Sequence, residues 1–127
     1  MAGRLASVSG AANFLVVDDH AAFRSALARA LGKYGAVKYA GTVLEGKELI
    51  VREPWAAVFI DVTLPDGNGL DVLEFARTHG CVAPVLVLTV SDDPQTIHRA
   101  GEHGAKFAVK PGDWREIDAF VRGALPP

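Results

Sequence analysis

Short apolar runs alternate along the chain with segments in which apolar residues recur at helical spacing. The runs predict strands over residues 14–17, 37–43, 58–61, 85–89 and 107–110. The segments that follow them predict helices over residues 21–33, 44–53, 70–79, 94–103 and 114–124. In the first of these helices, Phe23, Leu27 and Leu31 fall at positions i, i+4 and i+8. Strands that alternate with helices in this way favour an α/β fold, with helices on both faces of a parallel sheet.

The character of the strands narrows the topology. The run that ends at Asp61 is apolar on both faces, as central strands of parallel sheets are, whereas 37–43 alternates loosely and suits a strand nearer an edge. Right-handed crossovers leave few arrangements for such a sheet. We therefore predict a doubly wound, flavodoxin-like (βα)5 fold with the strand order 2-1-3-4-5. Its switch point lies between the first and third strands.

Polar residues stand at the ends of four of the predicted strands. Asp18 and Asp19 follow the first strand, and Asp61 ends the third. Thr89 ends the fourth strand and Lys110 ends the last. The carboxyl ends of parallel strands meet at one edge of the sheet, and open α/β sheets bind their ligands there. A single aspartate in this position can simply end a strand or cap a turn. Polar residues at the ends of four strands, by contrast, together predict a binding site.

The residue types at this edge point to phosphoryl chemistry. Carboxylates this close repel one another and raise each other's pKa unless a cation neutralises them, and Mg²⁺ favours carboxylates together with water and phosphate oxygens. Lys110 adds an ammonium that can hold a phosphate oxygen, and Thr89 adds a hydroxyl. Asp61, the single acid on the central strand, is the predicted nucleophile, which would form an acyl phosphate. His20 could be a metal ligand or a proton carrier, but we interpret it as a residue of the helix start.

Composition adds bounds to this picture. The 127 residues, half of them hydrophobic, suit one domain, which we place at residues 13–125 between a disordered lead-in over 1–12 and a tail over 126–127. The formal net charge of -2 and the pI of about 6.0 give no basic field for nucleic acid. No apolar run reaches the roughly 20 residues that span a bilayer, and the single cysteine, Cys81, suits a reducing compartment. We therefore predict a cytoplasmic protein without a nucleic-acid or membrane partner.

The motifs as a set resemble those of the receiver domains of two-component response regulators, over about residues 13–125. They are Val17-Asp18-Asp19, Asp61 to Pro65 followed by Gly67 to Gly69, Leu88-Thr89 and Lys110-Pro111. The resemblance implies that Asp61 takes a phosphoryl group from a phosphohistidine of a sensor histidine kinase or a phosphotransfer protein. It implies that Mg²⁺ is bound by Asp18, Asp19, Asp61 and the backbone carbonyl of Thr63. It also implies a signalling module, which catalyses only its own phosphoryl transfer and hydrolysis.

A conformational switch follows from the same resemblance. The hydroxyl of Thr89 would move to the phosphoryl group, and an aromatic residue of the last strand, Phe107, would turn into the space it leaves. The readout face would comprise the last two helices and the strand between them. Its partner is a downstream protein, an output domain or a second copy in a phosphorylation-dependent homodimer. The resemblance also implies a cis peptide bond before Pro111.

Three residues beside the motifs modify these expectations. Val90 is larger than the residue that usually follows the family's threonine, so we expect it to narrow access to the phosphoryl group. Thr63 and Ser91 lie two positions beyond Asp61 and Thr89. Neither is an acid or an amide suited to orient an attacking water, which predicts slow self-dephosphorylation.

Two other functions are compatible with an aspartate at a strand end. One is a receiver-like binding module that acts without phosphorylation, although the complete set of acids, threonine and lysine argues against lost chemistry. The other is a phosphatase or phosphotransferase that resembles the haloacid-dehalogenase-type hydrolases. Those enzymes need a second acid two residues after the nucleophile, where this chain has Thr63. They also usually carry a cap insertion, for which 127 residues leave little room.

Overall fold

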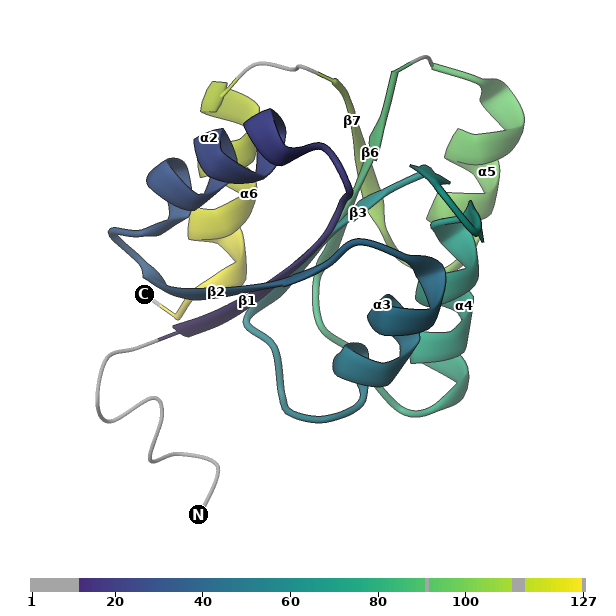
Figure 1. The fold of residues 1–127 in the computed structure, drawn as a ribbon, viewed down its shortest axis with the longest axis horizontal. Coiled ribbons are helices and arrows are strands. Elements are labelled where there is room, and N and C mark those ends of the chain that lie inside the picture. Colours follow the sequence, from purple (N-terminus) through teal and green to yellow (C-terminus); the bar gives the residue numbers. More distant parts are fainter. Residues whose placement is uncertain (1–11, 91, 111–113, 127) are drawn as a thin grey trace.

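A sheet of five parallel strands forms the centre of the fold in the computed structural model, which describes residues 12–90, 92–110 and 114–126 (Figure 1). The strands of this sheet are β1 (Ala12–Val17), β2 (Gly35–Ala40), β3 (Ala57–Asp61), β6 (Val85–Thr89) and β7 (Lys106–Val109). Hydrogen-bonded neighbours follow the order β2-β1-β3-β6-β7. The predicted order 2-1-3-4-5 is therefore confirmed, with β2 at an edge.

Helices cover both faces of the sheet, as Figure 1 shows. One face carries α2 (Ala21–Leu31) and α6 (Trp114–Ala124). The other face carries α3 (Val43–Ile50), α4 (Leu70–Thr78) and α5 (Pro94–Glu102). This arrangement is the doubly wound α/β architecture that the alternating pattern predicts.

The two faces of β3 build two separate hydrophobic cores. Val58 and Ile60 point to the core shared with α3 and α4, while Phe59 points to the core shared with α2 and α6. All three side chains are fully buried, and each burial of this kind contributes about 1.5–3 kcal/mol relative to exposure. Phe59 also meets Phe120 of α6 edge to face, with ring centroids 5.5 Å apart. The strand that ends in Asp61 is thus held rigidly from both sides.

The bounds of α3 differ from the predicted helix over 44–53 at both ends. Thr42 is the N-cap, and its side-chain oxygen accepts a hydrogen bond from the Glu45 amide at 3.0 Å, so the helix begins at Val43. At the other end, the indole nitrogen of Trp55 donates to the carbonyls of Leu49 and Ile50. The indole thereby pairs with carbonyls of the last turn, where the helix ends, and the Leu49 carbonyl also accepts from the Arg52 amide at 3.1 Å. The buried Trp55 therefore has a structural role at the end of α3.

A short hairpin follows β3, where the sequence predicts only a loop. Its strands, β4 (Thr63–Leu64) and β5 (Gly67–Asn68), pair antiparallel. The Asp66 carboxylate accepts hydrogen bonds from the Val43 and Leu44 amides at 2.7 and 3.1 Å, which ties the hairpin to the start of α3. A Cβ atom at Gly69 would overlap the backbone oxygen of Asp61. Only glycine therefore lets the hairpin return so closely behind Asp61.

Several predictions fall partly or wholly outside the residues that the structure describes. They are the lead-in over 1–11, Ser91 and the peptide bond before Pro111. Ala12, which the sequence places in the lead-in, is described and begins β1. Within the described part of the chain, no helix has both the length and the apolar character needed to cross a membrane.

Candidate functional site

The parallel register brings the predicted site residues to the carboxyl edge of the sheet. Val17 pairs with Ile60 across β1 and β3, so Asp18 and Asp61 follow at the same level. Asp61 in turn pairs with Leu88, directly before Thr89. The backbone amide of Lys110 donates to the Thr89 carbonyl at 2.6 Å. Four neighbouring strands therefore deliver the acids, the threonine and the lysine to one edge.

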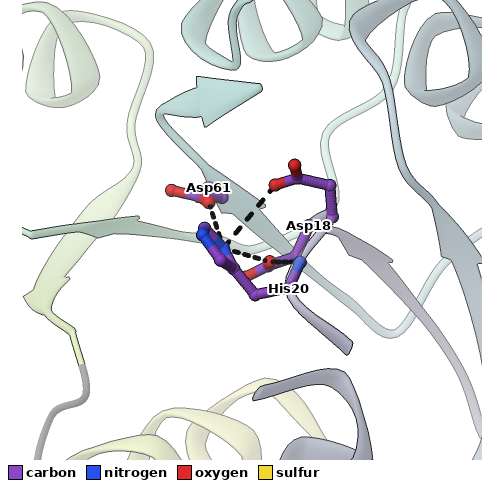
Figure 2. A group of neighbouring side chains, drawn as sticks. Asp18, His20 and Asp61 are labelled. Atoms are coloured by element: carbon purple, nitrogen blue, oxygen red, sulfur yellow. Dashed lines mark hydrogen bonds and ion pairs between the residues drawn. The ribbon is translucent and has the colours of Figure 1, made fainter. Parts of the chain in front are cut away.

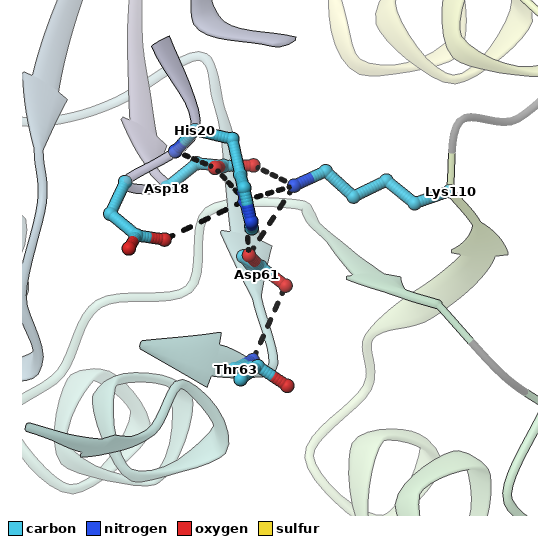
Figure 3. A network of polar contacts seen from close by, with 6 residues as sticks. Asp18, His20, Asp61, Thr63 and Lys110 are labelled. Carbon is cyan, nitrogen blue, oxygen red and sulfur yellow. Dashed lines mark hydrogen bonds and ion pairs between the residues drawn. The ribbon is translucent and has the colours of Figure 1, made fainter. Parts of the chain in front are cut away.

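Asp18, Asp19 and Asp61 form what we call the acid cluster, and the first and last of them share one buried cation. The side chains of Asp18 and Asp61 are 0% and 2% exposed, whereas Asp19 lies nearer solvent. Lys110 reaches across from the end of β7, with its Nζ 2.7 Å from Asp18 Oδ2 and 3.3 Å from Asp61 Oδ2 (Figure 3). The lysine side chain is itself only 7% exposed. The cluster thus combines three acids and one ammonium, and water is largely excluded from all of them except Asp19.

The pKa of Asp61 is raised above its ordinary value, chiefly because burial penalises the charged carboxylate. The negative charge of Asp18 raises it further. Lys110 and the Thr63 amide, which donates to Asp61 Oδ1 at 3.2 Å, act in the opposite direction without cancelling the effect of burial. An incompletely neutralised carboxylate of this kind favours the approach of a further cation.

The donors of the acid cluster fit a divalent cation. Ligand atoms of Asp18, Asp19, His20 and Asp61 all lie within 4.8 Å of one another. Asp18 Oδ2 is buried and forms an ion pair with Lys110, but it makes no hydrogen bond of good geometry within the described residues. The Lys110 ammonium therefore occupies a place among carboxylate oxygens that a small divalent metal ion would also bind. For Thr63 the structure gives the amide contact, and the ligand role of its carbonyl stays a prediction.

Thr89 and Phe107 occupy different environments. Thr89 is buried at the end of β6, beside the backbone of Lys110. Phe107 is 39% exposed on the edge strand β7. Val90, directly after Thr89, is also exposed, so its side chain stands mainly in solvent. The predicted movement of Thr89 and Phe107 stays a prediction.

His20 lies in the site, although the sequence analysis weighed a metal-ligand or proton-carrier role for it and preferred a residue of the helix start. It is the N-cap of α2, as predicted, but its side chain makes no capping hydrogen bond. The imidazole instead lies among the acids, with Nδ1 3.1 Å from Asp18 Oδ1 and 3.3 Å from Asp61 Oδ2 (Figure 2). Lys110 Nζ lies 2.9 Å from the same nitrogen. The signal was its place directly after two acids at a strand end, which the sequence alone could not separate from ordinary helix capping.

An aromatic path leads from Lys110 to the surface. The Lys110 ammonium lies 4.5 Å from the ring centroid of Phe23, which is within cation–π distance. The Phe23 ring stacks on Trp114, with centroids 5.7 Å apart. Trp114 thus packs on Phe23, yet it remains partly exposed at the start of α6. A displacement of the Lys110 ammonium would therefore change the surroundings of the Phe23 ring, on which Trp114 stacks.

The family model for the response regulator receiver domain matches residues 14–122 of the chain. The chain therefore belongs to the receiver domain family of two-component response regulators. It is a signalling module rather than a classical enzyme. The predicted fold class and this general function are both confirmed.

Relatives with established names support the same assignment. The chain is 38% identical over 120 residues to the photosynthetic apparatus regulatory protein RegA of Rhodobacter capsulatus, covering 91% of this chain and 65% of RegA. It is 34% identical over 113 residues to the response regulator protein PilR of Pseudomonas aeruginosa, covering 87% of this chain and 25% of PilR. The chain thus spans only part of the length of these relatives.

Solved structures agree with this fold. The non-phosphorylated HemR receiver domain from Leptospira biflexa superposes with a TM-score of 0.81 at 28% identity, covering 91% of this chain and 98% of that one. The BeF3-activated DrrB receiver domain gives a TM-score of 0.76 at 26% identity, covering 90% of this chain and 97% of that one. The likeness therefore extends over nearly the whole of both receiver domains.

Proposed function

We propose that Asp61 is the residue that accepts the phosphoryl group in this receiver domain. The observation that carries the proposal is the Lys110 ammonium, held between the buried carboxylates of Asp18 and Asp61 at the carboxyl edge of the sheet. Receiver domains of response regulators work with a histidine kinase. The donor is accordingly a phosphohistidine of a sensor kinase or of a phosphotransfer protein. The receiver unit is the segment 13–125.

Phosphoryl transfer to Asp61 exchanges one bond to phosphorus for another. A carboxylate oxygen of Asp61 forms a bond to phosphorus while the bond from phosphorus to the donor's histidine nitrogen breaks, and that nitrogen keeps the electron pair. The Lys110 ammonium holds one phosphoryl oxygen, and the Thr89 hydroxyl donates to another. Positioning and charge neutralisation supply most of the catalysis in such a step.

The cation site that we propose uses Asp19, Asp61 and the Thr63 carbonyl, with Asp18 acting through a water molecule. Receiver domains generally bind Mg²⁺ at an acidic pocket, and the acid cluster provides such a pocket here. Mg²⁺ bound there would neutralise charge on the carboxylates and on the phosphoryl oxygens. The buried carboxylates of Asp18 and Asp61 support this set, since burial without full neutralisation favours a cation.

The proposed signalling output depends on residues beside the phosphorylation site. Thr89 and Phe107 form the switch, and α5, β7 and α6 form the face that meets a downstream partner, an output domain or a second copy. The path from Lys110 through Phe23 to Trp114 supports this, because it links the site to the start of α6. Neither Thr63 nor Ser91 is an acid or an amide well suited to orient an attacking water, so the phosphorylated form is long-lived.

Intact mass spectrometry after incubation with Mg²⁺ and acetyl phosphate tests the proposal. The parent chain should gain one phosphoryl group, and Asp61→Asn should gain none. Asp92→Asn removes an exposed acid from the loop after β6 and should be phosphorylated like the parent. Phosphorylation of Asp61→Asn, or none of the folded parent with either acetyl phosphate or a phosphorylated kinase domain, would overturn the assignment. Decay of the phosphorylated parent within seconds would contradict slow hydrolysis.

A further inference from the structure

The imidazole of His20 completes a ring of donors around one point of the acid cluster. Its Nδ1 lies 3.1 Å from Asp18 Oδ1, 3.3 Å from Asp61 Oδ2 and 3.6 Å from Asp19 Oδ1. Three acids and one nitrogen therefore converge in a space of the size that a single cation fills. Figure 2 shows the ring standing between Asp18 and Asp61.

The cation already present in this space shows how the donors are directed. The Lys110 ammonium lies 2.9 Å from His20 Nδ1, 2.7 Å from Asp18 Oδ2 and 3.3 Å from Asp61 Oδ2 (Figure 3). A lysine ammonium only donates, so in the tautomer that accepts this hydrogen bond the lone pair of Nδ1 faces the same positive charge as the two buried carboxylates. In the other tautomer, Nδ1 donates to Asp18 Oδ1 at 3.1 Å.

Helix capping does not explain this placement. The side chain of His20 makes no capping hydrogen bond with α2, although His20 occupies the N-cap position. Its side chain is 56% exposed, while Nδ1 is turned inward to the acids. The exposed flank formed by His20 and Asp19 also leaves a route by which an ion can enter from solvent.

We infer that His20 is a nitrogen ligand of the divalent cation, so that this site takes transition-metal ions such as Mn²⁺ and Co²⁺ in preference to Mg²⁺. The inference rests on the cation site of the proposed function and adds a specificity-determining residue to it. Imidazole nitrogen suits transition metals, and affinity for nitrogen ligands rises along the first-row series, whereas Mg²⁺ favours oxygen. Two cations do not share one such space, so the ion displaces the Lys110 ammonium, which becomes available to the phosphoryl group.

Metal binding without any turnover tests this. The chain, free of any added histidine tag, is titrated with Co²⁺ and with Mg²⁺ by isothermal calorimetry, and the visible absorption of Co²⁺ is recorded. His20→Ala should lower the ratio of Co²⁺ to Mg²⁺ affinity by roughly tenfold or more, because even a residue that only orients a ligand is worth that much. His20→Gln, which offers oxygen in place of nitrogen, should lower the same ratio and shift the Co²⁺ spectrum.

His98→Ala is the matched control, since this exposed histidine of α5 is paired with Glu102 at 3.6 Å, away from the acid cluster. It should leave both affinities unchanged. An unchanged affinity ratio and Co²⁺ spectrum in folded His20→Ala and His20→Gln would overturn the inference. If the parent is phosphorylated with Mg²⁺ in that case, only the role of His20 fails. If the parent binds neither ion, the cation site of the proposed function fails as well.

Discussion

Two groups of charged side chains in this molecule have similar members, but the pKa of a carboxyl group is raised in one and lowered in the other. The acid cluster lies buried at the carboxyl edge of the sheet, with Lys110 as its cation. The second group, which we call the clamp, joins α4 to α5 through Asp71, Glu74 and Arg99. Arg99 donates from Nε to Glu74 Oε2 at 2.6 Å and from Nη2 to Glu74 Oε1 and Asp71 Oδ1 at 2.8 and 2.9 Å.

The pKa shifts show what this difference means. In the clamp, the hydrogen bonds from Arg99 lower the pKa of Glu74, and the effect of burial is smaller. In the acid cluster, burial raises the pKa of Asp61, and Lys110 offsets this effect only in part. In the clamp, the Arg99 guanidinium donates to two carboxylates near the surface with matched geometry. In the acid cluster, the single Lys110 ammonium lies among three acids and leaves negative charge uncompensated. The clamp is therefore complete in itself, and the acid cluster is built to receive a cation from outside.

Glycine substitutions should give the largest contrast between the two regions. Gly69 has helical backbone angles, but a Cβ there would overlap the Asp61 backbone and lie 2.8 Å from Ile60 Cγ2. Gly69→Ala should therefore lower the free energy of unfolding by about 3 kcal/mol, at the upper end of overpacking costs. In urea denaturation the midpoint should fall accordingly.

Gly101 of α5 provides the control beside the clamp. Apart from its chain neighbours and the backbone of its own helix, no atom lies within 4 Å of a Cβ placed there, so Gly101→Ala should stabilise the chain by about 0.5–1 kcal/mol through the helix backbone. Equal effects of the two substitutions would show that the backbone behind Asp61 is not held as tightly as its packing indicates.

Mg²⁺ should stabilise the folded chain through the acid cluster alone. At about one hundred times its Kd, a ligand that binds only the folded state adds about 2.7 kcal/mol to the free energy of unfolding. Thermal melts with and without chelator should show this as a rise in Tm. Asp19→Asn should shrink the response, while Asp71→Asn, in the clamp, should keep it. A response that is lost equally in both variants would place the ion elsewhere.

Neutralising one acid in each region should change stability in opposite directions. Because the pKa of Asp61 is raised above its ordinary 3.8, the ionised carboxylate costs stability as the pH rises through the raised value. Asp61→Asn should therefore raise Tm by a few degrees at neutral pH in the absence of metal, and the gain should vanish below 3.8. Glu74→Gln should lower Tm at neutral pH instead. A loss of stability in Asp61→Asn at neutral pH would mean that Lys110 does compensate Asp61.

Much of the fold could be predicted because strands that are buried on both faces consist of continuous apolar runs, which are easy to recognise in a sequence. β3 and β6 are buried along their whole length, and their apolar runs end at Asp61 and Thr89 as predicted. The edge strand β2 was less well placed, at 37–43 rather than Gly35–Ala40, because a half-exposed strand carries a weaker pattern. The hairpin after β3 was missed, since strands of two residues leave no period to detect, and the tether from Asp66 to α3 joins residues far apart in sequence.

The site could be predicted to the level of residue types at strand ends, but not to the level of their side-chain directions. Strand order and register suffice to bring Asp18, Asp61 and Lys110 together. They do not determine where an N-cap side chain points. His20 turns toward the acids rather than the helix, and that choice depends on local rotamers and charges.

The clamp provides the last and smallest contrast, through acid. Because the pKa of Glu74 is lowered below its ordinary 4.5, its bond with Arg99 adds stability above that pH and loses it as the pH falls through the lowered value. The pair is partly exposed, so its worth is about 0.2–1 kcal/mol after screening by solvent. Glu74→Gln should therefore lose less stability than the parent between neutral pH and acid below 4.5, as followed by urea denaturation at each pH.

Glu116→Gln removes an exposed glutamate of α6 and should lose stability on acidification as the parent does. If Glu74→Gln also matches the parent, Arg99 does not hold the Glu74 carboxylate in solution. The contrast between the clamp and the acid cluster would then be supported by the raised pKa of Asp61 alone. If Glu74→Gln is the less acid-sensitive variant, a carboxyl group has opposite effects on stability in the two regions, because the effect of burial is larger at Asp61 and that of the matched guanidinium is larger at Glu74.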